Sequence, residues 1–163
     1  MQETEYKRDR TIKDIVDHRQ QEEIIKRSKI CHVSLVDKDK PYGLAFCFGY
    51  KDNIIYLHTA KAGKKLKILR KNNNVCVVFD TDHDLFYRHE HIACSWSMRY
   101  RSVIAFGKAH FVEDYDEKIE GLRIFMQNYT DRDFEYSKPS VDNVEIIKII
   151  IEKMTGRSFE YII

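Results

Sequence analysis

Apolar residues along the chain form alternating or continuous runs that are typical of β-strands, with few helical patterns between them. Strand patterns cover residues 29–36, 42–50 and 54–59, and the polar stretches between these segments are short enough for hairpin turns. A continuous apolar run at 75–79 predicts a strand buried on both faces, and a run rich in isoleucine at 144–153 predicts a final strand. The pattern therefore predicts a chain of strands joined mainly by turns.

The pattern is less regular in the middle of the chain. Residues 80–94 combine acidic, histidine and aromatic residues without a clear period, and we interpret them as a long loop or insertion. Residues 95–112 are either a long strand pair or one bent strand that breaks near Gly107. Residues 155–157, Thr-Gly-Arg, predict a turn that ends the last strand.

Two segments carry helical signals. Asp17 can cap a helix that runs to Arg27, with a glutamine three residues after the cap as a partial capping box. Asp114 can cap a second helix over 115–129, where apolar side chains recur at helical spacing. Residues 130–142 are polar and include a proline, which predicts a loop.

Roughly six strands with few helices between them predict a mostly β (α+β) fold, an antiparallel barrel with peripheral helices. At 163 residues the chain is long enough for one domain with a substantial core. We divide it into an N-terminal arm, residues 1–16, and a single domain, residues 17–163. The sequence contains no internal repeat and no low-complexity segment.

The charge balance argues against binding to nucleic acids or membranes. Lys and Arg together number 28 and Asp and Glu 26, which leaves a formal net charge of +2. No apolar run approaches the roughly 20 residues of a membrane-spanning helix, and the polar N-terminal residues do not form a secretory signal. The four cysteines, Cys31, Cys47, Cys76 and Cys94, have no disulfide-like spacing, so we expect reduced thiols and a cytoplasmic location.

The most informative stretch is 54–69, which predicts a strand, a short turn over 60–63 and the start of a helix. Within the strand, His58 shares one face with Ile54 and Tyr56, whereas Thr59 lies on the other face. Gly63, Lys64 and Lys65 stand where the helix begins, so free backbone N–H groups and two ammonium groups could bind a phosphate there. The alternative is a surface helix whose lysines are simply solvated.

The motifs Tyr-Leu-His-Thr-Ala-Lys-Ala-Gly-Lys-Lys-Leu (56–66) and Tyr-Arg-Ser-Val-Ile-Ala-Phe-Gly-Lys-Ala (100–109), in this order of elements, resemble the pyridoxamine 5′-phosphate oxidase-like flavin-binding split barrels. Within that family the chain looks most like the nitroimidazole-resistance group. The resemblance covers roughly residues 17–156 and includes a closing Met-Thr-Gly. It implies a split barrel, FMN as cofactor with FAD possible, and a homodimer with two flavin sites at its interface.

The resemblance also implies roles for individual residues. The strand segment Leu44, Ala45, Phe46 and Cys47 would line the isoalloxazine ring, and His58, Thr59 and Ala60 would contact the cofactor. Lys64 and Lys65, after Gly63, would take the place of an Arg-Lys pair that holds the phosphate. Ser102, five residues before a glycine, stands where the oxidases place a ring-contacting Gln, and Tyr100 would form either a wall of the pocket or part of the core.

These assignments lead to alternative functions. The first is a flavin-dependent reductase that passes electrons from a reduced nicotinamide or another donor to a small aromatic acceptor such as a 5-nitroimidazole. His58 would serve as the catalytic residue, as a hydrogen-bond donor or proton source, unless it is only a hydrogen-bonded histidine at the barrel mouth. The second is a non-catalytic flavin carrier or redox sensor. Metal binding by the histidines and Cys94 of 83–94 and haem binding are weaker alternatives, and we assign no metal ligand.

Overall fold

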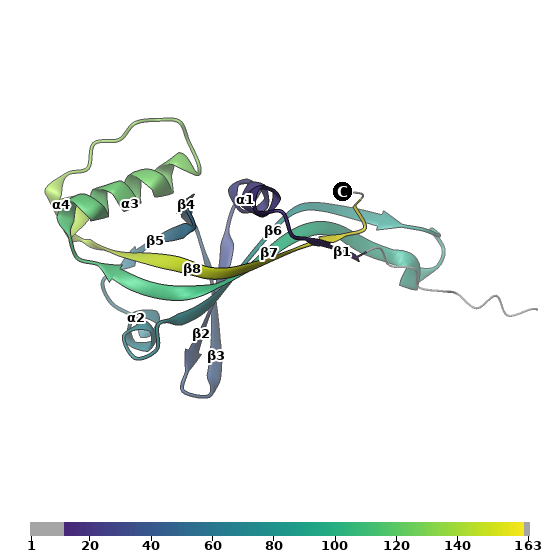
Figure 1. Cartoon of the computed structure of the whole chain (residues 1–163), viewed down its shortest axis with the longest axis horizontal. Helices are drawn as coiled ribbons and strands as arrows, with labels where there is room; N and C mark the ends of the chain where they lie inside the picture. The colour runs from purple at the N-terminus through teal and green to yellow at the C-terminus, as the bar shows by residue number, and fades with distance from the viewer. Residues whose placement is uncertain (1–11, 162–163) are drawn as a thin grey trace, which may run out of the picture.

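A computed structural model describes residues 12–161, which form one antiparallel sheet curled into a barrel, with helices on its outside (Figure 1). The strands follow the order β3-β2-β6-β7-β8-β5-β4, and β1 pairs with the far end of β8. The strands are β1 (Ile12–Ile15), β2 (Cys31–Asp37), β3 (Lys40–Phe46), β4 (Gly49–Lys51), β5 (Ile54–Ala60), β6 (Asn74–Tyr87), β7 (Trp96–Val112) and β8 (Val144–Phe159).

The barrel closes at a break in one predicted strand. Residues 42–50 were expected to form a single strand, which is wrong: the chain leaves the ladder after Phe46 and starts β4 at Gly49. Strand β3 pairs with β2 and β4 pairs with β5, so the two pieces lie at opposite ends of the strand order. The short step between them therefore joins the two edges of the sheet.

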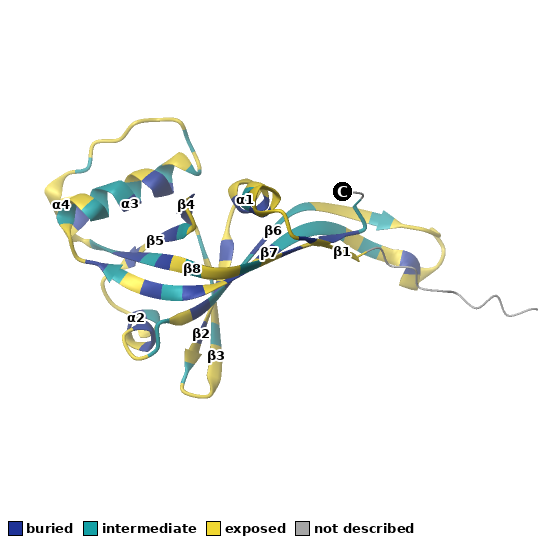
Figure 2. Cartoon of the chain, in the orientation of Figure 1, coloured by how far each residue is buried: buried dark blue, intermediate teal, exposed yellow. Residues whose placement is uncertain are grey.

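The barrel interior is apolar and nearly inaccessible to solvent. Alternate residues of β2, β6 and β7 point inward, as the alternation of buried and exposed positions along these strands shows (Figure 2). Phe79, fully buried, meets the ring of Phe48 edge-on with 4.9 Å between ring centroids. Exclusion of this apolar area from water is the main force that holds the strands together.

Four α-helices and a 3₁₀ turn accompany the described sheet. The predicted caps are confirmed: the Asp17 and Asp114 side chains accept hydrogen bonds from Gln20 N and Glu117 N. α3 packs on the outside of β4 and β5, whereas α1 packs on β6 and β7 and α2 on β2. The helices are α1 (His18–Arg27), α2 (Lys64–Leu69), α3 (Tyr115–Gln127) and α4 (Lys138–Asp142), and the 3₁₀ turn η1 covers Ala93–Ser95.

Three further expectations need correction. Residues 80–94 are not simply a loop, because β6 continues to Tyr87 through a bulge between Thr81 and Asp84. Strand β8 does not turn at 155–157 but pairs with β7 as far as Phe159. The polar loop at 130–142 contains the short helix α4, whose N-cap is Ser137.

Of the two interpretations of residues 95–112, a strand pair or one bent strand, the structure contains the single strand. β7 is a single strand of 17 residues, and its register with β8 shifts between Phe106 and Gly107. The expected barrel of six strands therefore contains eight in the described sheet, because the short β1 and β4 add to it. Of the predicted N-terminal arm, residues 1–11 lie outside the described residues, while Ile12–Ile15 pair with β8.

Candidate functional site

The predicted strand, turn and helix of residues 54–69 are present as β5 and α2. Gly63 is the N-cap of α2 and has φ 133°, a conformation that side-chain-bearing residues rarely adopt. Leu66, Ile68 and Leu69 anchor the helix in the barrel core. This anchoring leaves the first helical residues, Lys64 and Lys65, at the rim.

Both lysines extend toward the β2–β3 hairpin. The Lys64 ammonium lies 3.4 Å from a carboxylate oxygen of Asp37 and 4.7 Å from the centre of the Tyr42 ring. The Lys65 ammonium lies 5.9 Å from the centre of the Phe46 ring. The Lys64–Asp37 pair is largely exposed, so it holds its geometry weakly, and an anion could take the place of the carboxylate. The site therefore offers two positive charges beside aromatic rings.

The predicted ring-lining residues lie on or just after β3, next to these lysines. Leu44 and Phe46 are partly buried, and Phe46 packs against the barrel core. Ala45 and Cys47 are exposed. Because side chains alternate along a strand, Leu44 and Ala45 point to opposite faces of β3, so one face of β3 does not carry all of them.

His58 and Thr59 lie on opposite faces of β5, as predicted. Thr59 is buried, and Ala60 follows it at the exposed end of the strand. The His58 ring meets the Phe125 ring of α3 edge-on, with 4.5 Å between centroids. His58 therefore faces α3 on the outside of the barrel, whereas the lysines extend toward the β2–β3 hairpin.

The packing under α3 affects the charge of His58. Although part of the ring remains open to solvent, its surroundings desolvate it and lower the pKa of His58 below the ordinary value of 6.5. The neutral imidazole is consequently the dominant form at neutral pH. In that form one ring nitrogen donates a hydrogen bond and the other accepts one.

Tyr100 and Ser102 lie in a different part of the sheet. They pair with Phe159 and Arg157 of β8, and the Tyr100 ring stacks on Phe159 with 5.4 Å between centroids. Both residues line a cavity of about 210 Å³ that also includes Asp14 and Ile104. The structure thus brings the β3 segment and the two lysines together, but it places Tyr100 and Ser102 apart from them.

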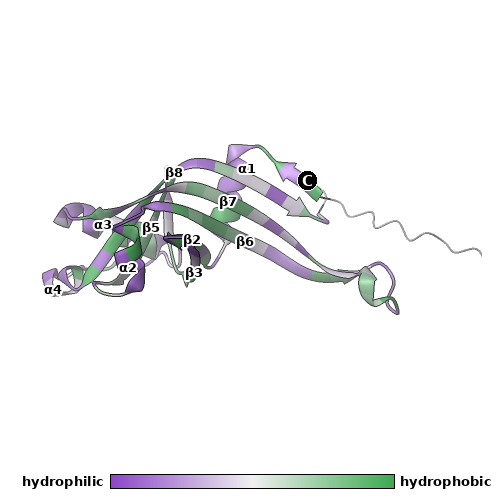
Figure 3. Cartoon of the chain, turned by 90° about the horizontal axis from the view of Figure 1, so that it is seen from below, coloured by the Kyte–Doolittle hydropathy of each residue, from purple (hydrophilic) through white to green (hydrophobic). Residues whose placement is uncertain are grey.

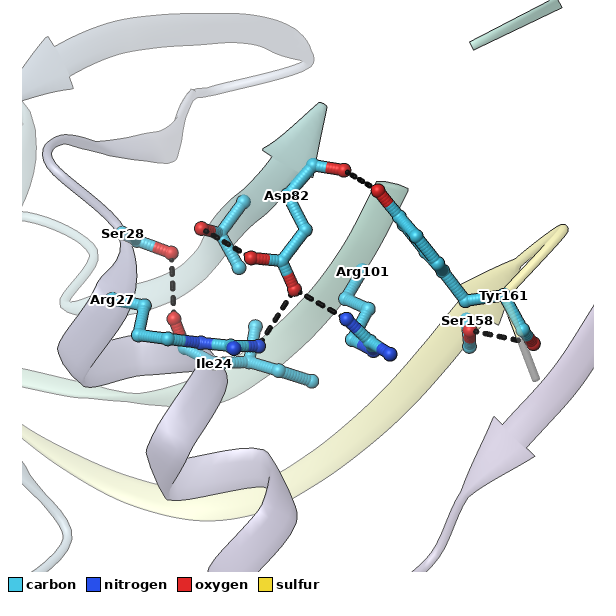
Figure 4. A network of polar contacts seen from close by, with 8 residues as sticks. Ile24, Arg27, Ser28, Asp82, Arg101, Ser158 and Tyr161 are labelled. Atoms are coloured by element: carbon cyan, nitrogen blue, oxygen red, sulfur yellow. Dashed lines mark hydrogen bonds and ion pairs between the residues drawn. The ribbon is translucent and has the colours of Figure 1, made fainter. Parts of the chain in front are cut away.

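Sequence reasoning missed a polar cluster at the bulge of β6. Asp82 has φ 59°, and its carboxylate accepts hydrogen bonds from Arg27 and Arg101, each at 2.6 Å (Figure 4). Its backbone carbonyl accepts one from the Tyr161 hydroxyl at 2.8 Å. The signal was available, because an acidic residue inside an irregular stretch is a common sign of a bulge or turn. Arg101, which belongs to the 100–109 motif, is held in this cluster by its ion pair with Asp82.

The described residues offer little support for metal binding, one of the weaker alternatives. Among residues 12–161, no group of three or more His, Cys, Asp or Glu side chains could hold a metal ion. The four cysteines are free thiols. None of the described helices has the length and apolar character needed to cross a membrane.

A family model described as pyridoxamine 5′-phosphate oxidase matches residues 17–158. The chain belongs to this family. Among solved structures, it is similar to a candidate 5-nitroimidazole antibiotic resistance protein from Bacteroides thetaiotaomicron, with 39% identity and a TM-score of 0.82 over 92% of this chain and 89% of that one. No curated protein sequence matches it. The family and this neighbour confirm the resemblance that the two motifs indicated.

More distant solved structures share the fold of this chain. An FAD- and haem-binding protein from Mycobacterium smegmatis aligns with a TM-score of 0.79 and 17% identity, over 91% of this chain and 74% of that one. An FAD-binding protein from Mesorhizobium loti aligns with a TM-score of 0.66 and 17% identity, over 90% and 97%. These similarities confirm the predicted mostly β, antiparallel split-barrel fold.

Proposed function

We propose that this protein binds a flavin, FMN in the first instance, and uses it to reduce small aromatic acceptors such as 5-nitroimidazoles. The electrons would come from a reduced nicotinamide or another donor. Membership of the oxidase family and 39% identity to a candidate nitroimidazole-resistance protein support this proposal. The observation that carries it is the pair Lys64 and Lys65 beside the aromatic side of β3. The free thiols agree with a reducing compartment, so we place the protein in the cytoplasm.

The residues present fit a flavin mononucleotide. Two ammonium groups at the first turn of α2 suit a phosphate, which would compete with Asp37 for Lys64. The Phe46 ring, near the Lys65 ammonium, offers an aromatic surface against which a planar ring could lie, whereas Ala45 is exposed on the opposite face of β3. FAD is the alternative cofactor, because the adenylate can extend beyond the phosphate site, and two of the distant neighbours are named as FAD-binding proteins.

The residues of this chain would bind the flavin, orient its ring and shield it from solvent. A bound flavin supplies the redox chemistry, since it can accept electrons from one molecule and pass them to another. Lys64 and Lys65 would fix its phosphate end, and the β3 segment would orient the ring. His58, neutral at physiological pH, would donate a hydrogen bond to the acceptor or move a proton at one of its ring nitrogens.

The distribution of these residues favours a homodimer. Tyr100 and Ser102 contact β8 and line the cavity near β1, whereas the lysines contact the β2–β3 hairpin. His58 faces α3. A site that uses all of them needs a second copy of the chain to bring the separate parts together. We therefore propose two flavin sites per dimer, each built from both chains.

The separation of His58 from the lysines also supports a second function. A chain whose anchor and proton donor face different ways could hold a flavin without turning it over. The alternative is a non-catalytic flavin carrier or redox sensor. It uses the same binding residues and differs only in lacking reduction of an acceptor.

One experiment separates these functions. The visible spectrum of the purified protein, with FMN or FAD added where needed, should contain flavin bands that bleach anaerobically with NADH or NADPH and return with a 5-nitroimidazole. Bands that no donor bleaches favour the carrier or sensor. Failure to bind either flavin would rule out both functions.

The proposed phosphate anchor, Lys64 and Lys65, can be tested against a matched pair of control lysines on the same segment. Lys64→Ala/Lys65→Ala should weaken FMN binding by at least tenfold at low salt, because two charges facing the phosphate are lost. Lys61→Ala/Lys67→Ala removes two exposed lysines of the same turn and helix and should change affinity less than twofold. Equal affinities of the two variants would contradict the anchor.

The role of His58 is testable by separating binding from turnover. His58→Asn should keep FMN affinity while it slows acceptor reduction. In the unaltered protein, a rate that needs the neutral imidazole should persist below pH 6.5 and fall only as the pH drops through the lowered pKa of His58. Full activity of His58→Asn would leave this histidine with a structural role.

A further inference from the structure

Strand β7 has an open edge near its C-terminal end. Its pairing with β6 ends at Lys108, so residues 109–112 pair only with β8. The last contact on the open side is a hydrogen bond from Ala109 N to the Asn73 carbonyl, at 2.8 Å. Because the peptide groups of an antiparallel strand point alternately to its two sides, the N–H of Phe111 faces the same open edge as that of Ala109. The edge therefore presents a backbone donor to whatever binds beside it.

The end of α2 lies next to this edge and leaves a pocket of about 340 Å³ between them, which we call the edge pocket. It is lined by Leu69, Arg70, Lys71 and Asn73 on one side and by Ala109, His110 and Phe111 of β7 on the other. Leu69 and Ala109 belong to the barrel core, so both walls are fixed by packing. The helix thus combines buried apolar side chains with exposed cations, as its mixed colouring shows (Figure 3).

The surroundings of the edge pocket are positively charged. Neither residues 53–79 nor residues 102–112 contain an Asp or a Glu, although the whole chain is nearly neutral. In the described part of the chain, Arg70 and Lys71 form no ion pair. The Arg70 guanidinium instead lies over the Phe111 ring, 5.1 Å from its centre. Two exposed cations without an acidic partner therefore line the pocket.

These groups match a phosphate beside a planar ring. Arg70 and Lys71 can form charge-assisted hydrogen bonds with phosphate oxygens, and the N–H of Phe111 adds a backbone donor. The guanidinium of Arg70 is planar, and only one of its faces lies on Phe111, so a second aromatic ring can stack on the other face while the N–H groups bond in the plane. A phosphate joined to a planar base is a nucleotide.

The edge pocket and the proposed phosphate anchor lie at opposite ends of α2. Arg70 follows Lys64 by six residues, which corresponds to about 9 Å along a helix axis. FAD and the reduced nicotinamide dinucleotides carry the same adenylate moiety. FAD would bring it to the edge pocket by extending from the anchor, and a nicotinamide dinucleotide would bring it as the electron donor.

We propose that the edge pocket binds the adenylate moiety of a dinucleotide. Its phosphate lies at Arg70, Lys71 and the N–H of Phe111, and its adenine stacks on the guanidinium of Arg70. The choice of a dinucleotide rests on the proposed flavin function. The nucleotide site itself depends only on the shape and charge of the edge pocket.

Free 5′-AMP is the probe for this site, and adenosine, which lacks the phosphate, is its control. Titrations followed by two-dimensional ¹H–¹⁵N NMR give both affinities and show which amides respond. Arg70→Gln/Lys71→Gln removes the two charges of the pocket. Lys61→Gln/Lys67→Gln is the matched control, because it removes two exposed lysines of the same segment that do not line the pocket. Circular dichroism checks the fold of both variants.

The unaltered protein and Lys61→Gln/Lys67→Gln should bind 5′-AMP, with a shift of the Phe111 amide signal. Arg70→Gln/Lys71→Gln should bind it at least tenfold more weakly at low salt, because two charged contacts with the phosphate are lost. Failure of the unaltered protein to bind 5′-AMP, equal affinities of the two variants, or equal binding of adenosine would overturn the site.

Flavin binding and steady-state kinetics identify the source of the adenylate. If the source is FAD, Arg70→Gln/Lys71→Gln should lose FAD affinity and keep FMN affinity. If it is a nicotinamide dinucleotide, the KM for that donor should rise while kcat stays unchanged. Binding of 5′-AMP with neither change would keep the nucleotide site and overturn its link to a dinucleotide. A protein that binds 5′-AMP but neither FMN nor FAD would support the edge pocket and reject the proposed function.

Discussion

The two ends of the β6–β7 hairpin lie in different surroundings although the same two strands form both. In the barrel, Val77, Phe79 and Val103 are fully buried, and the hairpin has neighbours on both sides. In the β6–β7 arm, which comprises residues 84–98, the strands pair only with each other, and Leu85 remains 60% exposed. Strand pairing alone therefore does not decide burial. The barrel end is stabilised by its apolar interior, whereas ion pairs such as Arg99–Asp84 and Arg88–Glu160 support the ribbon end.

The largest effect should come from the barrel end. Gly107→Ala would place a Cβ 2.2 Å from the carbonyl oxygen of Ile150, so the β7–β8 ladder must shift. We expect a loss of about 3 kcal/mol in the free energy of unfolding, measured by urea denaturation. Gly43→Ala is the matched control, because a Cβ there has no atom within 4 Å, and its change should stay below about 1 kcal/mol. Similar losses for both would mean that close packing does not distinguish the barrel end.

A smaller effect should come from the junction between the two ends. Asp82→Ala removes the acceptor for two arginines and places alanine at φ 59°, so we expect a loss of about 1–2 kcal/mol by the same measurement. Asp82→Asn removes the charge but keeps an acceptor and tolerates this backbone conformation. The free energy of unfolding should therefore fall less for Asp82→Asn than for Asp82→Ala. The reverse order would show that charge alone holds the junction.

Substitution of a cysteine should have the smallest effect on stability but a clear effect on the reaction with Ellman's reagent. Burial raises the pKa of Cys31, in the barrel, to about 12, whereas Cys94 is exposed at the tip of the arm. Ellman's reagent should therefore react with Cys94 in the folded protein and with Cys31 only after unfolding. Cys94→Ser should remove one fast thiol without changing stability. Loss of the same fast thiol in Cys31→Ser would contradict the assignment.

The two ends also differ in how well the sequence predicts them. The barrel follows from local signals: Asp17 and Asp114 cap their helices, and β5 divides its apolar residues between two faces as expected, with Ile55 in the barrel core and Tyr56 in the cluster under α3. The arm could not be predicted from local signals, because the bulge at 82–83, directly before it, interrupts the alternation of side chains and because its charged residues resemble a solvated loop. The break after Phe46 was missed for another reason, since an uninterrupted apolar run does not reveal a change of partner strand.

The candidate site also has one part that the local sequence predicts and one part that it does not. The turn at Gly63 and the helix that begins at Lys64 were predicted from local chemistry, and they lie where expected. Which groups lie near one another is a property of the curled sheet. The contact of His58 with Phe125 and the distance of Tyr100 from the lysines depend on strands far apart in the chain, and no local pattern encodes them.

The step from β3 to β4 has a consequence for the order of folding. The Tyr129 hydroxyl accepts a hydrogen bond from Phe48 N at 2.8 Å and donates one to the Lys29 carbonyl at 3.0 Å, so the residues directly after α3 hold this step in place. The two edges are already joined there through the chain, so the ring closes only when β6, β7 and β8 assemble between β2 and β5. Closure of the ring thus waits for contacts that are distant in sequence, which is the slow class of folding event. We expect Phe48 to have a φ-value near zero, while Val77 and Val103 take part in the folding nucleus.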